Sequence, residues 1–242
     1  MNITAIIQAR MGSTRLPGKV MNKLGDQTVL GHVINRVLAI PTLDQVIVAT
    51  TTETEDDHIC QEASHYGVNY FRGSRTNVLS RYYEAAKEVK SDVVVRITSD
   101  CPLLDPLISD KVITHFLDND LDYSSSGLSG TFARGLDTEV FTFDALSRSY
   151  FHATKEYEYE HVTPYIYQHP DLFHIHAYSS STDFSRYRLT LDTPEDWELI
   201  SRIYGELYTG SIFHWNEILS LLERQPELAL INAEVKQKKL GE

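Results

Sequence analysis

The chain has 242 residues, of which 42% are hydrophobic and 23% charged, and its formal net charge at pH 7 is -12. These proportions are ordinary for a globular domain, and the acidic balance argues against nonspecific binding to nucleic acid. No apolar run approaches the roughly 20 residues that a membrane span requires, and residues 1–4 lack the basic segment of a secretory signal. The two cysteines, Cys60 and Cys101, have no metal-like spacing, so we expect a cytoplasmic protein without disulfide bonds.

Strands and helices alternate through the first half of the sequence. Short apolar runs predict strands at 3–8, 45–51, 69–72 and 92–98. Apolar positions at helical spacing, together with capping residues, predict helices at 29–40, 54–67, 77–89 and from Asp105-Pro106 onward. This alternation predicts an α/β fold of Rossmann-like type, with a mostly parallel sheet flanked by helices on both faces.

The regular alternation of strands and helices ends after about residue 120. The serine- and glycine-rich residues 124–130 predict a turn-rich segment. The remaining pattern predicts strands at 140–143, 174–179 and 188–192, and helices within 153–168, at 194–208 and in 213–232. We expect one domain over residues 1–242, in which residues 120–185 form an inserted α+β elaboration whose aromatic residues provide the contact surface of a homodimer.

The loop after the first strand carries three cations, Arg10, Arg15 and Lys19, between two glycines and several small polar residues. Exposed backbone N–H groups and fixed positive charges suit a polyphosphate, although a polar surface loop is the simpler alternative. A Walker A loop has four residues between its glycines and a Ser or Thr after its lysine. Here five residues separate Gly12 from Gly18 and Val20 follows the lysine, so the loop is of another kind.

Residues 8–19, Gln-Ala-Arg-Met-Gly-Ser-Thr-Arg-Leu-Pro-Gly-Lys, resemble the signature of the sugar-acid cytidylyltransferases, which include the acylneuraminate and ketodeoxyoctonate enzymes. The resemblance is greatest to the spore-coat polysaccharide biosynthesis protein F branch, and it continues in order at residues 96–105, 135–140, 160–165 and 188–196. It implies a fold of the nucleotide-diphospho-sugar transferase type. It also implies Mg²⁺-dependent transfer of CMP from CTP to a sugar acid, with release of pyrophosphate, for cell-surface or spore-coat polysaccharide.

Two aspartates follow predicted strands, Asp100 before Cys101-Pro102 and Asp192 before Thr193-Pro194. Ligands of open α/β sheets bind at the carboxyl ends of the strands, and Mg²⁺ on a nucleotide needs one or two carboxylates besides phosphate oxygens. The resemblance also assigns both residues to the metal. The alternative is that each aspartate caps the helix that follows it.

The remaining site residues fall into two groups. Arg10 and Lys19 are expected to stabilise charge on the triphosphate, with nucleotide contacts from Gln8, Ala9, Met11, Gly12, Ser13, Arg15, Thr50, Ser74, Asn77 and Arg81. Arg134, Asp137 and Glu139 are candidates for the acceptor pocket within residues 120–185, because arginine grips a carboxylate with two hydrogen bonds and carboxylates bind hydroxyls. The resemblance places His161 near the acceptor as well.

Two other functions share parts of this pattern. A glycosyltransferase that consumes a nucleotide sugar has the same kind of fold, but we expect an Asp-x-Asp metal motif there and find Ser99-Asp-Cys101 instead. A non-catalytic nucleotide-binding subunit of a polysaccharide complex is the second alternative. The joint presence of Arg10, Arg15, Lys19, Asp100 and Asp192 argues against it. Guanylyl or uridylyl transfer differs only in the base, and side-chain identities alone leave it open.

Overall fold

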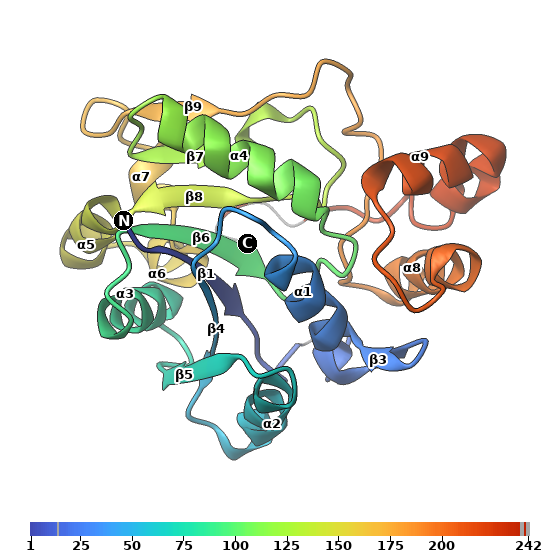
Figure 1. The fold of residues 1–242 in the computed structure, drawn as a ribbon, viewed down its shortest axis with the longest axis horizontal. Coiled ribbons are helices and arrows are strands. Elements are labelled where there is room, and N and C mark those ends of the chain that lie inside the picture. The colour runs from blue at the N-terminus through green and yellow to red at the C-terminus, as the bar shows by residue number, and fades with distance from the viewer. Residues whose placement is uncertain (14, 238–239, 241–242) are drawn as a thin grey trace.

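A seven-stranded sheet forms the centre of the computed structural model, which describes residues 1–13, 15–237 and 240 (Figure 1). The strand order is β5 (Asn69–Gly73), β4 (Gln45–Thr51), β1 (Ile3–Gln8), β6 (Val93–Thr98), β8 (Glu139–Thr142), β7 (Tyr123–Ser125) and β9 (Ile175–Ala177). Neighbouring strands run parallel, except that β8 is antiparallel to both of its neighbours. Thr14 lies outside the described residues.

Helices cover both faces of this sheet because side chains alternate along each strand. Ile3, Ala5 and Ile7 of β1 pack with α1 (Val29–Leu38), α2 (Asp57–His65) and α4 (Pro106–Asp118). Ile6 faces the other side, against α3 (Val78–Glu88), α5 (Phe143–His152), α6 (Glu156–His161) and α7 (Pro164–Tyr167). The predicted α/β fold class and the two-sided helical cover are therefore confirmed.

A third apolar cluster lies beside the sheet, where α8 (Pro194–Leu207) and α9 (Trp215–Arg224) pack together (Figure 1). Helix α8, predicted at 194–208, supplies Ile200, Ile203 and Tyr204 to this cluster. A short hairpin of β2 (Lys23–Leu24) and β3 (Gln27–Thr28) precedes α1. Short 3₁₀ helices lie at Lys19–Met21, Thr54–Asp56, Gly127–Ser129 and Pro226–Leu230.

Side-chain caps explain where three helices begin. The Asn77 side chain accepts a hydrogen bond from the Ser80 amide at the start of α3, and Asp105 accepts from two amides at the start of α4. Thr193 caps α8 and is paired with Asp196 in a capping box. These caps satisfy amide groups that the first turn of a helix leaves without partners.

Two predicted segments differ from the structure. Residues 124–130, expected to be turn-rich, begin inside strand β7, where Ser124 and Ser125 are buried because their small side chains fit the crowded interior of the sheet. Residues 188–192 are extended but form only an isolated bridge between Arg188 and Arg134 in place of the predicted strand. Strands β7, β8 and β9 within residues 120–185 belong to the main sheet. None of the helices in the described residues combines the length and the apolarity that crossing a bilayer requires.

Candidate active site

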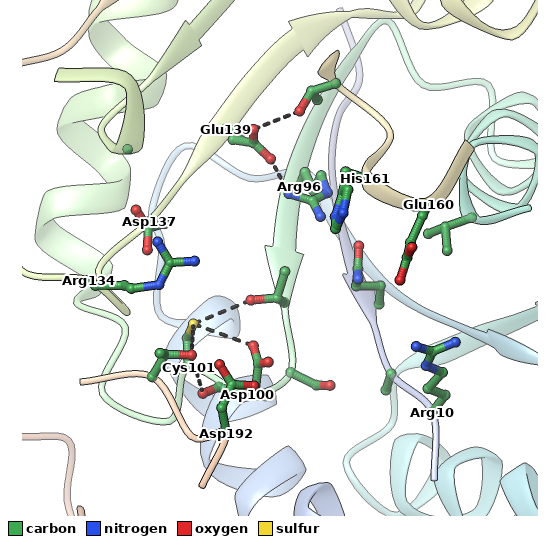
Figure 2. A pocket seen from close by; sticks show the side chains of 18 of the residues that line it. Arg10, Arg96, Asp100, Cys101, Arg134, Asp137, Glu139, Glu160, His161 and Asp192 are labelled. Carbon is green, nitrogen blue, oxygen red and sulfur yellow. Dashed lines mark hydrogen bonds and ion pairs between the residues drawn. The ribbon is translucent and has the colours of Figure 1, made fainter. Parts of the chain in front are cut away.

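A cavity of about 710 Å³ opens at the carboxyl ends of β1 and β6. Parallel strands present these ends at one edge of the sheet, where α/β proteins bind ligands. Asp100 and Asp192 lie at one end of the labelled group, and Glu139, Arg96 and His161 lie at the other (Figure 2). The cavity therefore joins the predicted metal residues to the predicted acceptor residues.

The cation-rich loop is fixed in shape by its own backbone and by one buried carboxylate. The amides of Ser13 and Gly18 both donate to the Met11 carbonyl, at 2.8 and 3.2 Å. Gly18 has φ 66°, a left-handed conformation that favours glycine. The carboxylate of Asp56, which is 1% exposed, accepts the Met11 amide at 2.7 Å and the Thr51 hydroxyl. The loop is thus tied to the end of β4.

Lys19 lies between the two predicted metal ligands. Its Nζ is 2.9 Å from Oδ2 of Asp100 and 2.9 Å from Oδ1 of Asp192, and it donates to the Leu191 carbonyl at 2.6 Å. Burial alone would lower the pKa of Lys19, but the two carboxylates outweigh it and raise that pKa. The same ion pair outweighs the burial of Asp100 and holds the pKa of its carboxyl below the usual value.

Asp192 is held from both sides by arginines. Its Oδ1 is 3.1 Å from Arg15 Nη2, and its Oδ2 is 3.1 Å from Arg188 Nη2. Arg188 also binds both carboxylate oxygens of Asp196, which is fully buried and accepts the Asp192 amide at 3.0 Å. Gln237, which lines the cavity, accepts from Arg188 at 2.7 Å.

The helix-cap alternative fails for both aspartates. Thr193, not Asp192, caps α8, and Asp105, not Asp100, caps α4. Both carboxylates contact the Lys19 ammonium, so their oxygens lie close together. Two neighbouring carboxylates fit the set of protein ligands that Mg²⁺ takes when phosphate oxygens complete its coordination shell. Among the described residues, no group of three or more His, Cys, Asp or Glu side chains is arranged to hold a metal without such help.

On the acceptor side, Arg134 and Asp137 lie on one wall of the cavity (Figure 2). Arg134 is exposed, and Asp137 accepts the Gly135 amide at 2.9 Å. Burial raises the pKa of the Asp137 carboxyl. Gly135 has φ 101°, and a Cβ there would lie 2.6 Å from the Leu189 carbonyl, so only glycine allows this close approach of the two segments.

Glu139 and His161 lie farther along the same cavity. Oε1 of Glu139 accepts from the hydroxyls of Tyr123 and Thr163, at 2.7 and 2.8 Å, and Oε2 pairs with Arg96. Its carboxylate therefore has three donors within the protein, while the side chain also lines the cavity. Burial lowers the pKa of His161, which favours the neutral imidazole.

The predicted nucleotide residues are only partly gathered at the cavity. Gln8, Ala9, Arg10, Gly12, Ser13, Arg15 and Arg81 line it. Met11, Thr50, Ser74 and Asn77 do not. Thr50 is fully buried, and Ser74 and Asn77 support α3 and Arg81, whose Nη1 donates to the Ser74 carbonyl at 2.9 Å. Burial lowers the pKa of Arg81.

Sequence reasoning missed three charged residues of this site: Arg96, Arg188 and Asp56. Arg96 and Asp56 bind partners that are distant in the sequence, whereas Arg188 binds Asp192 and Asp196, which lie four and eight residues further on. One signal was available for Arg96, because a charge inside an otherwise apolar central strand is unusual. Alternation also puts it on the same face of β6 as Thr98, which lines the cavity.

Comparisons with known proteins agree with the geometry. The family model described as Cytidylyltransferase matches residues 4–233. The spore coat polysaccharide biosynthesis protein SpsF of Bacillus subtilis is 35% identical over 94% of this chain and 97% of its own length. A solved cytidylyltransferase structure from Leptospira borgpetersenii superimposes with a TM-score of 0.91, at 35% identity over 99% of both chains.

A more distant relative matches one half of the chain. The 3-deoxy-manno-octulosonate cytidylyltransferase of Geobacter sulfurreducens is 33% identical over 49% of this chain and 47% of its own length. The resemblance stated from the motifs is therefore confirmed at the level of the family.

Proposed function

Because this chain belongs to the cytidylyltransferase family, we propose that it transfers CMP from CTP to a sugar acid, with release of pyrophosphate. Membership of the family makes it a nucleotidyltransferase. Its near full-length likeness to SpsF supports a place in cell-surface or spore-coat polysaccharide biosynthesis.

The observation that carries the proposal is the meeting of Lys19, Asp100 and Asp192 beside Arg10 and Arg15 in one cavity. The arginines and the lysine neutralise the charge of a triphosphate and of the departing pyrophosphate, which is the main demand of nucleotidyl transfer. Asp100 and Asp192 would hold Mg²⁺, which would supply Lewis-acid stabilisation of the phosphate oxygens.

The acceptor would bind at the wall of the cavity that Arg134 and Asp137 form. The Arg134 guanidinium is exposed to the cavity and has no ion pair among the described residues, so it is available to grip the carboxylate of a sugar acid. Asp137 lies beside it and would accept hydrogen bonds from sugar hydroxyls. Positioning of the acceptor hydroxyl near the α-phosphate is the remaining task of the protein.

The test is the thermal stability of the protein with CTP, UTP, GTP and ATP, each with and without Mg²⁺. A ligand at 100 times its Kd adds about 2.7 kcal/mol to the free energy of unfolding. A shift that is selective for CTP and needs Mg²⁺ is expected, followed by pyrophosphate release with a sugar acid. Stabilisation by a nucleotide sugar but by no triphosphate would favour the glycosyltransferase, and CTP binding without turnover would favour the non-catalytic subunit.

A further inference from the structure

The two carboxylate oxygens of Asp192 have different partners. Oδ1 lies 2.9 Å from Lys19 Nζ and 3.1 Å from Arg15 Nη2, and both of these cations are proposed to bind the triphosphate. Oδ2 lies 3.1 Å from Nη2 of Arg188, which does not line the cavity. A triphosphate that draws Lys19 and Arg15 to its own oxygens would therefore free Oδ1 and leave Oδ2 bound.

Arg188 is itself fixed by partners other than Asp192. Its Nε and Nη2 bind the two carboxylate oxygens of Asp196 at 2.8 and 2.9 Å, and its Nη1 donates to Oε1 of Gln237 at 2.7 Å. Asn232, which is 3% exposed, donates to the Arg188 carbonyl at 2.9 Å and to Asp196 at 2.8 Å. A planar guanidinium with all three nitrogens engaged keeps one orientation. The segment that follows α9 thus helps to hold a residue of the site.

Asp196 fixes the backbone of Asp192, just as Arg188 fixes its side chain. Oδ2 of this fully buried carboxylate accepts the amides of Asp192 and Thr193, at 3.0 and 3.1 Å. The same two residues, Thr193 and Asp196, form the capping box that begins α8. Both the main chain and Oδ2 of Asp192 are therefore held by the ion pair of Arg188 with Asp196, which is anchored to a helix.

The charges of this group suit a divalent cation once a triphosphate is bound. Ion pairs connect three cations and three carboxylates: Arg15, Lys19, Arg188, Asp100, Asp192 and Asp196. These six side chains have no net charge together. Asp196 compensates the charge of Arg188, so Arg188 can orient Asp192 without cancelling its charge. When the other two cations bind phosphates, Asp100 and Asp192 retain two negative charges, which match those of one divalent cation.

We propose that Arg188 is a positioning residue that holds Oδ2 of Asp192 and thereby presents Oδ1 to the metal of the nucleotide complex. This inference rests on the proposed function and adds a residue that acts through Asp192 from outside the cavity. Partners that orient a carboxylate ligand from behind typically contribute 10- to 100-fold to metal affinity. Loss of the Arg188 contact should therefore weaken binding of the metal–nucleotide complex and spare binding of the nucleotide alone.

The test measures the Kd of CTP by calorimetry, with and without Mg²⁺ and without any acceptor. Arg188→Lys keeps a cation beside the buried Asp196, but an ammonium lacks the planar fork that binds Asp196 and Asp192 together. This variant should bind Mg²⁺–CTP about 10- to 100-fold more weakly than wild type and should bind CTP alone equally well. Arg202→Lys, at an exposed ion pair with Glu198, is the matched control and should match wild type in both measurements.

The outcomes separate this inference from the proposed function. Equal binding of Mg²⁺–CTP by wild type and Arg188→Lys, or an equal loss with and without Mg²⁺, would overturn the role of Arg188 and leave the proposed function standing. A wild type that binds CTP in neither form would overturn both.

A second variant keeps the test decisive if Arg188→Lys does not fold. Gln237→Ala removes one acceptor of Arg188 at an exposed position, outside the apolar clusters. It should weaken binding of Mg²⁺–CTP about 2- to 10-fold relative to CTP alone, the range expected for one hydrogen bond. Unchanged binding of Mg²⁺–CTP by this variant would then count against Arg188 as a positioning residue.

Discussion

At the scale of single residues, Lys19 is the buried cation at which Asp100 and Asp192, the proposed metal ligands, meet. We predict that Lys19→Ala lowers turnover by about 10²-fold or more, because the triphosphate loses a buried cation. The exposed Lys23, whose Nζ donates to the Asp26 carbonyl at 3.4 Å, offers a matched control. Steady-state pyrophosphate release and circular dichroism measure the effect, and normal turnover by a folded Lys19→Ala protein would refute the assignment.

The same contacts predict competition between the lysine and a divalent cation. In the free protein the Lys19 ammonium lies between Asp100 and Asp192, where it neutralises their charge. Lys19→Met removes that cation and leaves two carboxylates close together, so we expect the free variant to bind Mn²⁺ more tightly than wild type. Electron paramagnetic resonance of free Mn²⁺ gives the affinity. Equal or weaker binding by the variant would contradict this competition.

Local spacing was enough to place the cation loop after β1 and Asp100 after β6. Asp192 was placed by a predicted strand over 188–192 that the structure replaces with an isolated bridge. Asp56 escaped prediction since it holds the Met11 amide from a distant part of the chain. Arg188 holds Asp192, only four residues further on, but the spacing alone did not indicate that the two side chains pair. Glu139 shows that sequence context does not reveal which internal partners a predicted site residue has. Its sequence context suggested a sugar contact, whereas the folded chain surrounds its carboxylate with three internal donors.

At the scale of secondary-structure elements, His32 connects α1 to α8. It is 5% exposed, its Nε2 donates to the Leu24 carbonyl at 2.7 Å, and its ring lies 4.5 and 4.9 Å from those of Tyr204 and Tyr208. Burial lowers its pKa from 6.5, and the nearby Arg36 adds to this against the opposing charge of Asp26. The folded protein therefore resists protonation of a ring that the unfolded chain protonates readily.

This arrangement predicts a loss of stability as pH falls below 6.5. Since the folded pKa of His32 lies below the unfolded one, the unfolded state binds the additional proton, and the slope reaches at most about 1.4 kcal/mol per pH unit for this group. Denaturant unfolding at pH 7.5 and 5.5 measures the change. His32→Gln should reduce the slope while the exposed His58→Gln should not, and an unchanged slope in His32→Gln would exclude His32 as its source.

The elements themselves show which patterns predict structure well. Strands β1, β4 and β6 are continuous apolar runs buried on both faces, and the apolar period identified them within a residue. Strand β7 was not predicted because two of its residues are serines, which elsewhere favour turns. A fully buried strand can nevertheless accept such small polar residues. Residues 188–192 have the apolar alternation of a strand, but their backbone pairs with loops around Arg134 and Asp100.

At the scale of the whole molecule, an aromatic patch on α3 and α5 is the clearest surface for self-association. Phe151 is 66% exposed, and its ring lies 5.1 Å from that of Tyr150, which stacks on Tyr83 at 4.2 Å. Leu172, also within residues 120–185, is 43% exposed. Aromatic residues are enriched at interfaces, so this patch fits the homodimer that the sequence led us to expect.

We predict that the protein has twice its chain mass of 27.6 kDa in solution and that Phe151→Asp shifts it toward the monomer. A charge at the centre of the patch must lose its hydration in the dimer, whereas the monomer keeps that position in water. Light scattering coupled to size exclusion measures the mass across a dilution series. Leu230→Asp is the matched control, because this residue is 71% exposed and lies outside the patch. A monomeric wild type, or a Phe151→Asp protein as dimeric as wild type, would exclude this surface as the interface.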